Sequence, residues 1–414
     1  MSKTKITLPP NTLFSYAEIE KFRNETRGTQ HVVHLNNAGA GLMPDIVTQA
    51  QLNHIKLEAE IGGYEAAALR AQAIAEFYSQ AAILFNCKPS NIAFTASATD
   101  SYTRALSSIP FKQGDIILTD NDDFVSNQIQ FLSLQKRFGI KIVHINNSKI
   151  GGVDLDDLTD KLKKLQPKLL AITHIPTNSG LIQPVDQIAS IYENYQQSYP
   201  CKTWYILDAC QSAGQMKLDV QNLKCDFLSA TGRKFLRGPR GTGMLYVANS
   251  VLESGLEPIF IDMRGAEWTQ KSLYRQHPEA KRFEDWEFAY STVLGTATAI
   301  AYCLNIGEDR IWNQIKLLSG IMRNKLEVLD KVRVLDEGPE LAGLVTFTVE
   351  GLDPGLIVGE LLKRKINVVP SFRAFGVIDF DQKGVEWAIR ASPHYYNTYY
   401  ELDFFIESLK EIIC

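Results

Sequence analysis

Cysteine is scarce in this chain, and its spacing excludes two classes of small-domain architecture. The 414 residues include only six cysteines, and none of them forms a Cys-x-x-Cys pair. This pattern argues against a structural zinc site and against a disulfide scaffold. The seven histidines show no metal-ligand spacing beyond His31 and His34, which we interpret as strand residues. We therefore expect no metal site.

Long apolar runs and a charge excess are also lacking. No run reaches the ~20 apolar residues of a membrane-spanning helix, and the start, MSKTKITLPPN, has no signal-like apolar stretch. The 43 basic and 47 acidic side chains give a net charge of −4, so the chain lacks the excess of positive charge that favours binding of nucleic acid. We expect a soluble, cytoplasmic protein that binds neither nucleic acid nor membranes.

What the sequence does contain is an alternation of short apolar, β-branched runs with longer helical patterns. Most of the runs are apolar on both faces, which is typical of a parallel sheet covered by helices on both sides. The pattern predicts an α/β fold with an open, mostly parallel sheet. The expected strands are 91–96, 115–120, 141–145, 168–175, 203–209, 225–230 and 243–248.

The pattern changes near residue 310 and predicts a smaller α+β domain. A helical stretch at 312–332 precedes expected strands within 341–351, 366–371 and 386–392. The closing helix should begin after Thr398, because Glu401 three residues later completes a capping box. We divide the chain into an N-terminal segment (1–30) near the small domain or the cleft, a large domain (31–305) and a small C-terminal domain (306–414).

Three segments in the large domain have residues that suggest chemistry. Lys234 follows an expected strand and precedes a glycine-rich turn, so it is either part of a basic surface loop or a Schiff-base nucleophile. Asp208 ends another strand, either as a helix cap or as the partner of a pyridinium nitrogen, with Gln211 near the ring's phenolate oxygen. Residues 97–99 form either an ordinary helix cap or a phosphate site at a helix N-terminus.

These elements, in this order, resemble the class V aminotransferase and cysteine desulfurase family, which are pyridoxal-phosphate (PLP) enzymes of fold type I. The resemblance runs from HLNNAGAG (34–41) to RASPHYYNT (390–398), and its most specific parts are LDACQ (207–211) and TGRK (231–234). The sequences of segments 231–243 and 173–180 most resemble the hercynylcysteine-sulfoxide lyase-like and isopenicillin-epimerase-like branch of the family. The resemblance implies PLP as cofactor, an amino acid as the small-molecule substrate, and a homodimer with the site at its interface.

The resemblance also assigns roles to individual residues. Lys234 would be the catalytic Schiff-base lysine, and Arg390 would bind the substrate carboxylate, a task suited to a guanidinium. Arg233 stands where the family usually has histidine. The remaining cofactor contacts would be Ser97, Ala98, Thr99, Phe124, Thr177 or Asn178, Asp208, Gln211, Thr231 and Arg233; Asn37, Ala38 and Gly39 would line the substrate side. Segments 264–268 and 282–290 would approach the partner's cofactor or form internal loops.

Two departures from the family pattern narrow the expected reaction. Phe124 occupies the place of a ring-stacking histidine, and phenylalanine can stack but cannot move protons. No cysteine lies between Cys303 and Cys414, where desulfurases have the thiol that accepts sulfur. We therefore expect carbon–sulfur β-elimination from a cysteine derivative, with transamination or epimerisation as alternatives. A sulfur-donating desulfurase and a non-catalytic PLP-fold binding protein are less favoured.

A dinucleotide-binding oxidoreductase is a further alternative that the sequence disfavours. Gly39 and Gly41 follow a possible strand, but Pro44 stands where the third glycine of the fingerprint would be. The region ~20 residues beyond, LNHIKLEAE (52–60), has a helical pattern and does not end a strand with an acidic residue.

Overall fold

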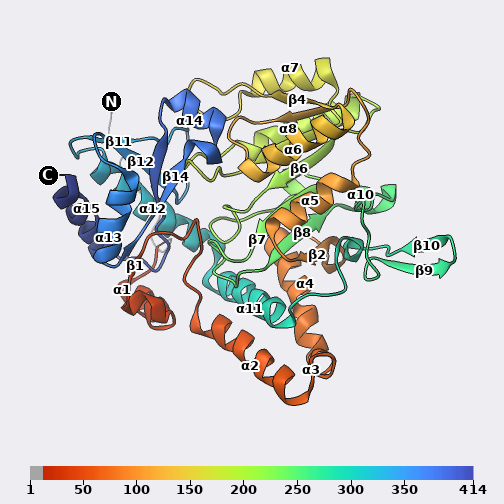
Figure 1. Cartoon of the computed structure of the whole chain (residues 1–414), viewed down its shortest axis with the longest axis horizontal. Coiled ribbons are helices and arrows are strands. Elements are labelled where there is room, and N and C mark those ends of the chain that lie inside the picture. Colours follow the sequence, from red (N-terminus) through yellow and green to blue (C-terminus); the bar gives the residue numbers. More distant parts are fainter. Residues whose placement is uncertain (1–12, 414) are drawn as a thin grey trace.

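The computed structural model describes residues 13–413 and is built around a seven-stranded sheet. The strands lie in the order β2-β8-β7-β6-β5-β3-β4. Only β8 runs antiparallel to its neighbours, so the expected mostly parallel sheet is confirmed (Figure 1). The strands are β2 (Ile92–Thr95), β3 (Ile116–Thr119), β4 (Lys141–His144), β5 (Leu169–Thr173), β6 (Trp204–Asp208), β7 (Phe227–Thr231) and β8 (Gly243–Val247).

Helices cover both faces of this sheet, which explains why its strands are apolar throughout. In β5, Leu169 and Ala171 pack into one core while Leu170 and Ile172 pack into the other. The first core is completed by α5 (Ala98–Ser108), α6 (Val125–Phe138) and α10 (Asn249–Ser254). The second is completed by α4 (Ala71–Phe85), α7 (Leu155–Leu165), α8 (Val185–Ser198), α9 (Val220–Leu223) and α11 (Tyr290–Ile306).

The C-terminal region forms a four-stranded antiparallel sheet with its own core. Its strand order is β11 (Val332–Val334), β12 (Val345–Val349), β15 (Trp387–Ala391) and β14 (Val369–Phe372). The helices α12 (Glu308–Leu326), α13 (Pro354–Lys363) and α15 (Tyr399–Ile413) pack on it. The capping box is confirmed, because Thr398 Oγ1 accepts from the backbone N–H of Glu401 at 3.2 Å and Glu401 accepts in return at 2.9 Å.

Two local expectations differ from the structure. The helix expected at 312–332 ends at Leu326; residues 327–331 form a turn, and Val332 begins β11, which pairs with β12. The strand expected at 366–371 is two strands: β13 (Ile366–Asn367) pairs with β1 (Val33–His34), and β14 pairs with β15. One stretch of chain thus links the N-terminal part to the C-terminal sheet.

The N-terminal part described by the structure contacts the C-terminal region. In α1 (Tyr16–Asn24), Arg23 forms an ion pair with Glu401 at 2.9 Å, and Phe14 packs on Tyr395. Residues 1–12 of the expected N-terminal segment lie outside the described residues. The domain boundaries at 30 and 305 stay a prediction.

The remaining elements lie at the periphery. The helices α2 (Asp45–Ile61) and α3 (Gly63–Leu69) precede α4, and α14 (Val377–Lys383) lies between β14 and β15 in the chain. A hairpin of β9 (Ala266–Gln270) and β10 (Leu273–Gln276) extends away from the body (Figure 1). None of the helices within residues 13–413 has the length and apolar character needed to cross a membrane.

Candidate active site

A pocket at the carboxyl ends of the central strands gathers most of the residues that the sequence singled out. It includes Lys234 and every expected cofactor contact except Asn178. Ligands bind to open α/β sheets at this edge, because the loops that follow parallel strands meet there. The pocket is lined by Ser97, Ala98, Thr99, Phe124, Thr173, Ile175, Thr177, Asp208, Cys210, Gln211, Thr231, Arg233 and Lys234.

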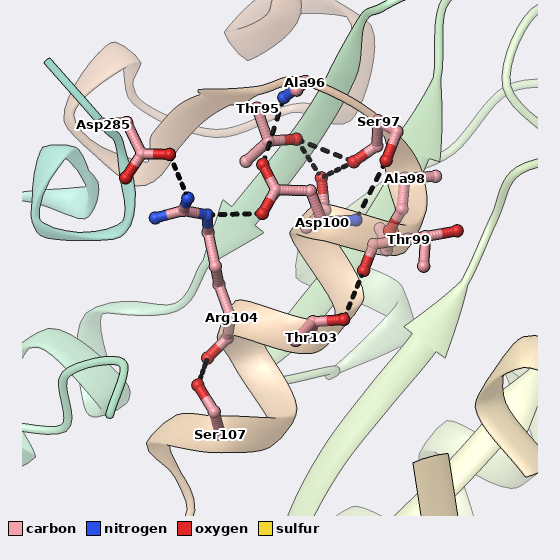
Figure 2. A network of polar contacts seen from close by, with 12 residues as sticks. Thr95, Ala96, Ser97, Ala98, Thr99, Asp100, Thr103, Arg104, Ser107 and Asp285 are labelled. Atoms are coloured by element: carbon pink, nitrogen blue, oxygen red, sulfur yellow. Dashed lines mark hydrogen bonds and ion pairs between the residues drawn. The ribbon is translucent and has the colours of Figure 1, made fainter. Parts of the chain in front are cut away.

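One end of the pocket is the N-terminus of α5 (Figure 2). Ser97 caps the helix, and its hydroxyl accepts from the backbone N–H of Asp100 at 3.1 Å. The Asp100 carboxylate accepts from the backbone N–H of Ala96 at 3.1 Å and pairs with Arg104, which also contacts Asp285. This network fixes the turn, and the first-turn N–H groups of Ala98 and Thr99 have no partner within the helix. The arrangement suits a phosphate.

The opposite wall presents an oriented carboxylate. Asp208 is buried at the end of β6, where its two oxygens accept from the side-chain amide of Asn127 at 3.2 Å and from the backbone N–H of Cys210 at 2.9 Å. Both donors hold the carboxylate in one orientation. A buried carboxylate held this way stabilises a cation placed against it, such as a protonated ring nitrogen.

Gln211 is buried in the same pocket, and only one end of its side-chain amide forms a hydrogen bond among the described residues. Its Nε2 donates to the carbonyl oxygen of Ala38 at 3.2 Å, while its Oε1 has no partner among the described residues. A buried acceptor without a donor calls for a ligand group in the pocket. The expected contact to a phenolate oxygen would require the amide to turn and present Nε2.

Lys234 lies in the turn after β7 and is 6% exposed. Burial, together with the charge of the neighbouring Arg233, lowers the pKa of Lys234 to about 8 against the opposing effects of Cys210 and Asp208. Its Nζ is 5.9 Å from the centroid of the Phe124 ring. A lysine with this pKa provides a neutral amine at slightly alkaline pH, which suits both Schiff-base formation and proton abstraction.

The segment 37–41 packs directly against the lysine turn. The backbone N–H of Gly41 donates to the carbonyl oxygen of Arg233 at 2.8 Å, and the Arg233 guanidinium donates to the carbonyl oxygen of Gly39. A Cβ on Gly41 would lie 2.6 Å from the carbonyl oxygen of Lys234, so only glycine fits there. Asn37 does not line the pocket, because its amide donates to the carbonyl oxygen of Ser392 at 2.8 Å and accepts from Tyr396 at 2.6 Å.

Arg390 enters the site region from β15 in the C-terminal sheet. It is 7% exposed, and its Nη1 donates to the carbonyl oxygen of Thr177 at 3.0 Å. Its Nε has no partner among the described residues. Burial and the charge of Arg233 lower its pKa to about 10, so the guanidinium stays charged at neutral pH. An incompletely paired, buried guanidinium fits a carboxylate.

Asn178 ties the loop after β5 to the C-terminal region. Its Nδ2 donates to the carbonyl oxygen of Phe375 at 2.7 Å, and its Oδ1 accepts from Ser371 at 2.5 Å. Both ends of the amide are therefore used outside the pocket. Of the two alternatives expected in this loop, Thr177 is the one that lines the pocket.

The structure adds residues that the sequence reasoning did not single out. Cys210 lies in the pocket between Asp208 and Gln211, and burial raises the pKa of its thiol well above the ordinary value. Its position inside the LDACQ segment was a signal that could have been used. Asn127 could not be found in this way, because its contact with Asp208 joins residues far apart in the chain. Across residues 13–413, no three His, Cys, Asp or Glu side chains are grouped to hold a metal ion.

Comparison with known proteins gives consistent results across nearly the whole chain. Residues 32–405 match the family described as aminotransferase class-V. A probable cysteine desulfurase of Pyrococcus abyssi is 28% identical, with 95% of this chain and 97% of the relative covered. The apo structure of a cysteine desulfurase from Thermococcus onnurineus aligns with a TM-score of 0.85 at 26% identity, covering 95% of this chain and 98% of that one.

A second solved structure similar to this chain has a different named activity. The complex of the cystine C–S lyase C-DES with its reaction product, cysteine persulfide, aligns with a TM-score of 0.83 at 25% identity and covers 93% of this chain and 99% of that one. A C-DES variant with glycine covalently linked to the PLP cofactor aligns with the same TM-score. The similar proteins therefore include both desulfurases and a lyase.

Proposed function

The chain belongs to the class V aminotransferase family of PLP-dependent enzymes, and from this premise we propose that it catalyses carbon–sulfur β-elimination from a cysteine derivative. The expected family and cofactor are thereby confirmed. PLP supplies an electron sink for the carbanion formed at the substrate α-carbon. The buried polar groups fit this cofactor, because the helix N-terminus, the Asp208 carboxylate and the Gln211 amide line one pocket with Lys234, and a turn of the amide would present Nε2 to the phenolate oxygen.

The chain's own residues divide the work between binding and proton transfer. We assign carboxylate binding to Arg390, whose Nε is free for a ligand. We assign phosphate binding to the first turn of α5 together with Arg233. Lys234 would remove the α-proton of the bound substrate at its Nζ. Phe124 lines the same pocket and would stack on the cofactor ring and help to exclude water, but it cannot carry protons.

One observation favours elimination over a reaction that forms a persulfide on the enzyme. No cysteine lies between Cys303 and Cys414. In the structure this stretch includes the segment that contacts the site loop, through Ser371 and Phe375 on Asn178. A persulfide-forming enzyme needs a thiolate within reach of the substrate sulfur. This segment has none, and burial raises the pKa of the pocket thiol of Cys210 well above its ordinary value, which disfavours its thiolate form. The similarity to a cystine C–S lyase also supports elimination.

A sulfur-donating desulfurase is the second candidate, because the similar curated proteins have that name. The two reactions differ in their products. Elimination from L-cystine or another cysteine S-derivative yields pyruvate, ammonia and a free persulfide or thiol, whereas desulfuration of L-cysteine yields alanine and an enzyme-bound persulfide. We expect pyruvate from the PLP-loaded protein incubated with L-cystine. The absence of pyruvate from L-cystine, with alanine and protein-bound sulfur formed from L-cysteine in a parallel incubation, would contradict the proposal.

We further propose that the protein is a homodimer. Large apolar side chains are exposed along 259–274, near and on the hairpin that extends from the body. Phe260 is 89% exposed and Trp268 is 78% exposed. Exposed aromatic groups of this size are typical of surfaces that another protein covers. The segment includes RGAEW (264–268), which we expect to approach the partner's site.

A further inference from the structure

Two buried aspartates face each other where the C-terminal region meets the site loop. Asp122 lies two residues before Phe124, in the loop after β3, and is 8% exposed. Asp379 lies on α14 and is 6% exposed. The two carboxyl groups lie close enough for each to shift the pKa of the other. The Oδ2 atom of each has no donor partner among the described residues. Two buried carboxylates this close, each with an oxygen that has no donor, repel each other unless one of them carries a proton.

We propose that Asp122 and Asp379 share one proton, and that this proton positions α14 and the Phe124 loop against each other and is lost as pH rises. The shared proton satisfies two buried oxygens that otherwise repel each other. The pair lies outside the catalytic pocket and acts through the elements that it joins. Asp122 and Asp379 are therefore positioning residues.

The surrounding contacts show what the pair holds in place. Gln382 on α14 accepts from Asn147 at 3.2 Å, and Asn147 accepts from Asn121 at 3.1 Å, so the loop after β4 gives α14 a second, indirect link to the loop of Asp122. The chain just before α14 holds Asn178 through the carbonyl oxygen of Phe375. Release of α14 would therefore loosen both the Phe124 loop and the loop of Thr177.

The charges around the two aspartates favour binding of a single proton by the pair. Lys383 forms a buried ion pair with Asp379 at 2.5 Å, which keeps a negative charge on that side. Burial and the facing Asp379 raise the pKa of Asp122 to about 7. The other charged groups that face the pair are Glu337 and Asp336, of which Asp336 is paired with Arg323 at 2.8 Å; Asp120 and Asp123 lie on the loop of Asp122 itself.

The sign of the pH effect follows from the raised pKa. An aspartate that titrates near ~3.9 when exposed and near 7 when docked favours docking most at low pH, and that advantage is lost as pH rises toward 7. Between pH 5.5 and pH 8 the docking equilibrium should weaken roughly 30-fold by this linkage. Above pH 8 the effect should level off.

Hydrogen exchange of residues 376–384 in the PLP-loaded protein tests the proposal. After correction for intrinsic rates, we expect the wild-type exchange to rise roughly 30-fold between pH 5.5 and pH 8. Asp122→Asn supplies a permanent donor and should abolish that rise. Asp381→Asn, on the same helix but in an exposed pair with Arg373, should retain it. A flat wild-type profile, or a wild-type rise in Asp122→Asn, would overturn the proposal.

A second measurement covers the case in which Asp122→Asn does not fold. Infrared difference spectra of the wild-type protein should show the C=O stretch of one protonated carboxyl that titrates near neutral pH. Asp379→Asn should remove this band, because its amide donates to Asp122 and makes the proton unnecessary. Persistence of the band in Asp379→Asn would assign the proton elsewhere and contradict the shared pair.

Discussion

At the scale of single residues, we expect the environment of Lys234 to set the pH at which the protein takes up its cofactor. Only the neutral amine attacks an aldehyde, and burial lowers the lysine pKa to about 8. The rate at which the apo protein forms a Schiff base with PLP should therefore rise with pH and level off above about 8. Absorbance after mixing at pH 6–10 measures this rate.

The same experiment has two informative variants. Lys234→Ala should form no borohydride-stable adduct, while Lys112→Ala, on the surface, should behave as the wild type. Arg233→Gln removes a neighbouring positive charge that lowers the pKa, so its midpoint should move to higher pH. A wild-type midpoint near the ordinary lysine value of ~10.4 would contradict the assignment.

Cys210 is the thiol in the pocket, and its environment predicts that it does not react. Burial raises its pKa well above the usual range, and the thiolate is the nucleophilic form. We expect Cys210→Ala to retain elimination activity within about threefold, because no step of the elimination uses this thiol. Alkylation of the native protein should label the exposed Cys201 and spare Cys210, as mass spectrometry can show. Loss of activity by ~100-fold in Cys210→Ala would make the thiol a participant.

At the scale of elements, β8 approaches the phosphate end of the pocket so closely that one position excludes every side chain. A Cβ on Gly243 would lie 2.3 Å from the backbone of Ser97. Gly243→Ala should therefore displace the α5 N-terminus, weaken PLP binding and destabilise the fold by about 1–3 kcal/mol. Urea unfolding and PLP titration measure the two effects.

Gly359 on α13 provides a matched control for that substitution. Nothing lies within 4 Å of a Cβ placed there. Gly359→Ala should be neutral or stabilise by about 0.5–1 kcal/mol, because alanine restricts the unfolded chain and favours the helix. Equal effects of the two substitutions would show that the contact with Ser97 does not constrain the pocket.

The elements of the central sheet were predictable because burial on both faces leaves a simple signal. Leu169 and Leu170 pack into opposite cores, so the strand is apolar without alternation. The short strands gave no such signal: β1 has two residues, and its partner β13 was merged with β14. Their pairing depends on a contact between distant parts of the chain, which no local pattern encodes.

The pocket was predictable in part for a related reason. Asp208 and Lys234 both follow strands of one parallel sheet, so their side chains had to meet at one edge. The family resemblance then supplied their roles. Side-chain direction was not predictable in the same way, because Asn37 and Asn178 belong to the right segments yet turn their amides to other partners.

At the scale of the whole molecule, the exposed apolar segment at 259–274 predicts a dimer of two 46.5 kDa chains. A stable interface buries about 800 Å² on each partner, with aromatic anchors at its centre. Phe260→Asp and Trp268→Glu, alone or together, should shift the protein toward a monomer in sedimentation velocity. Tyr400→Asp, equally exposed at 77% but on α15, should leave the dimer intact. A monomeric wild type, or a dimer unaffected by both substitutions, would remove this surface from the interface.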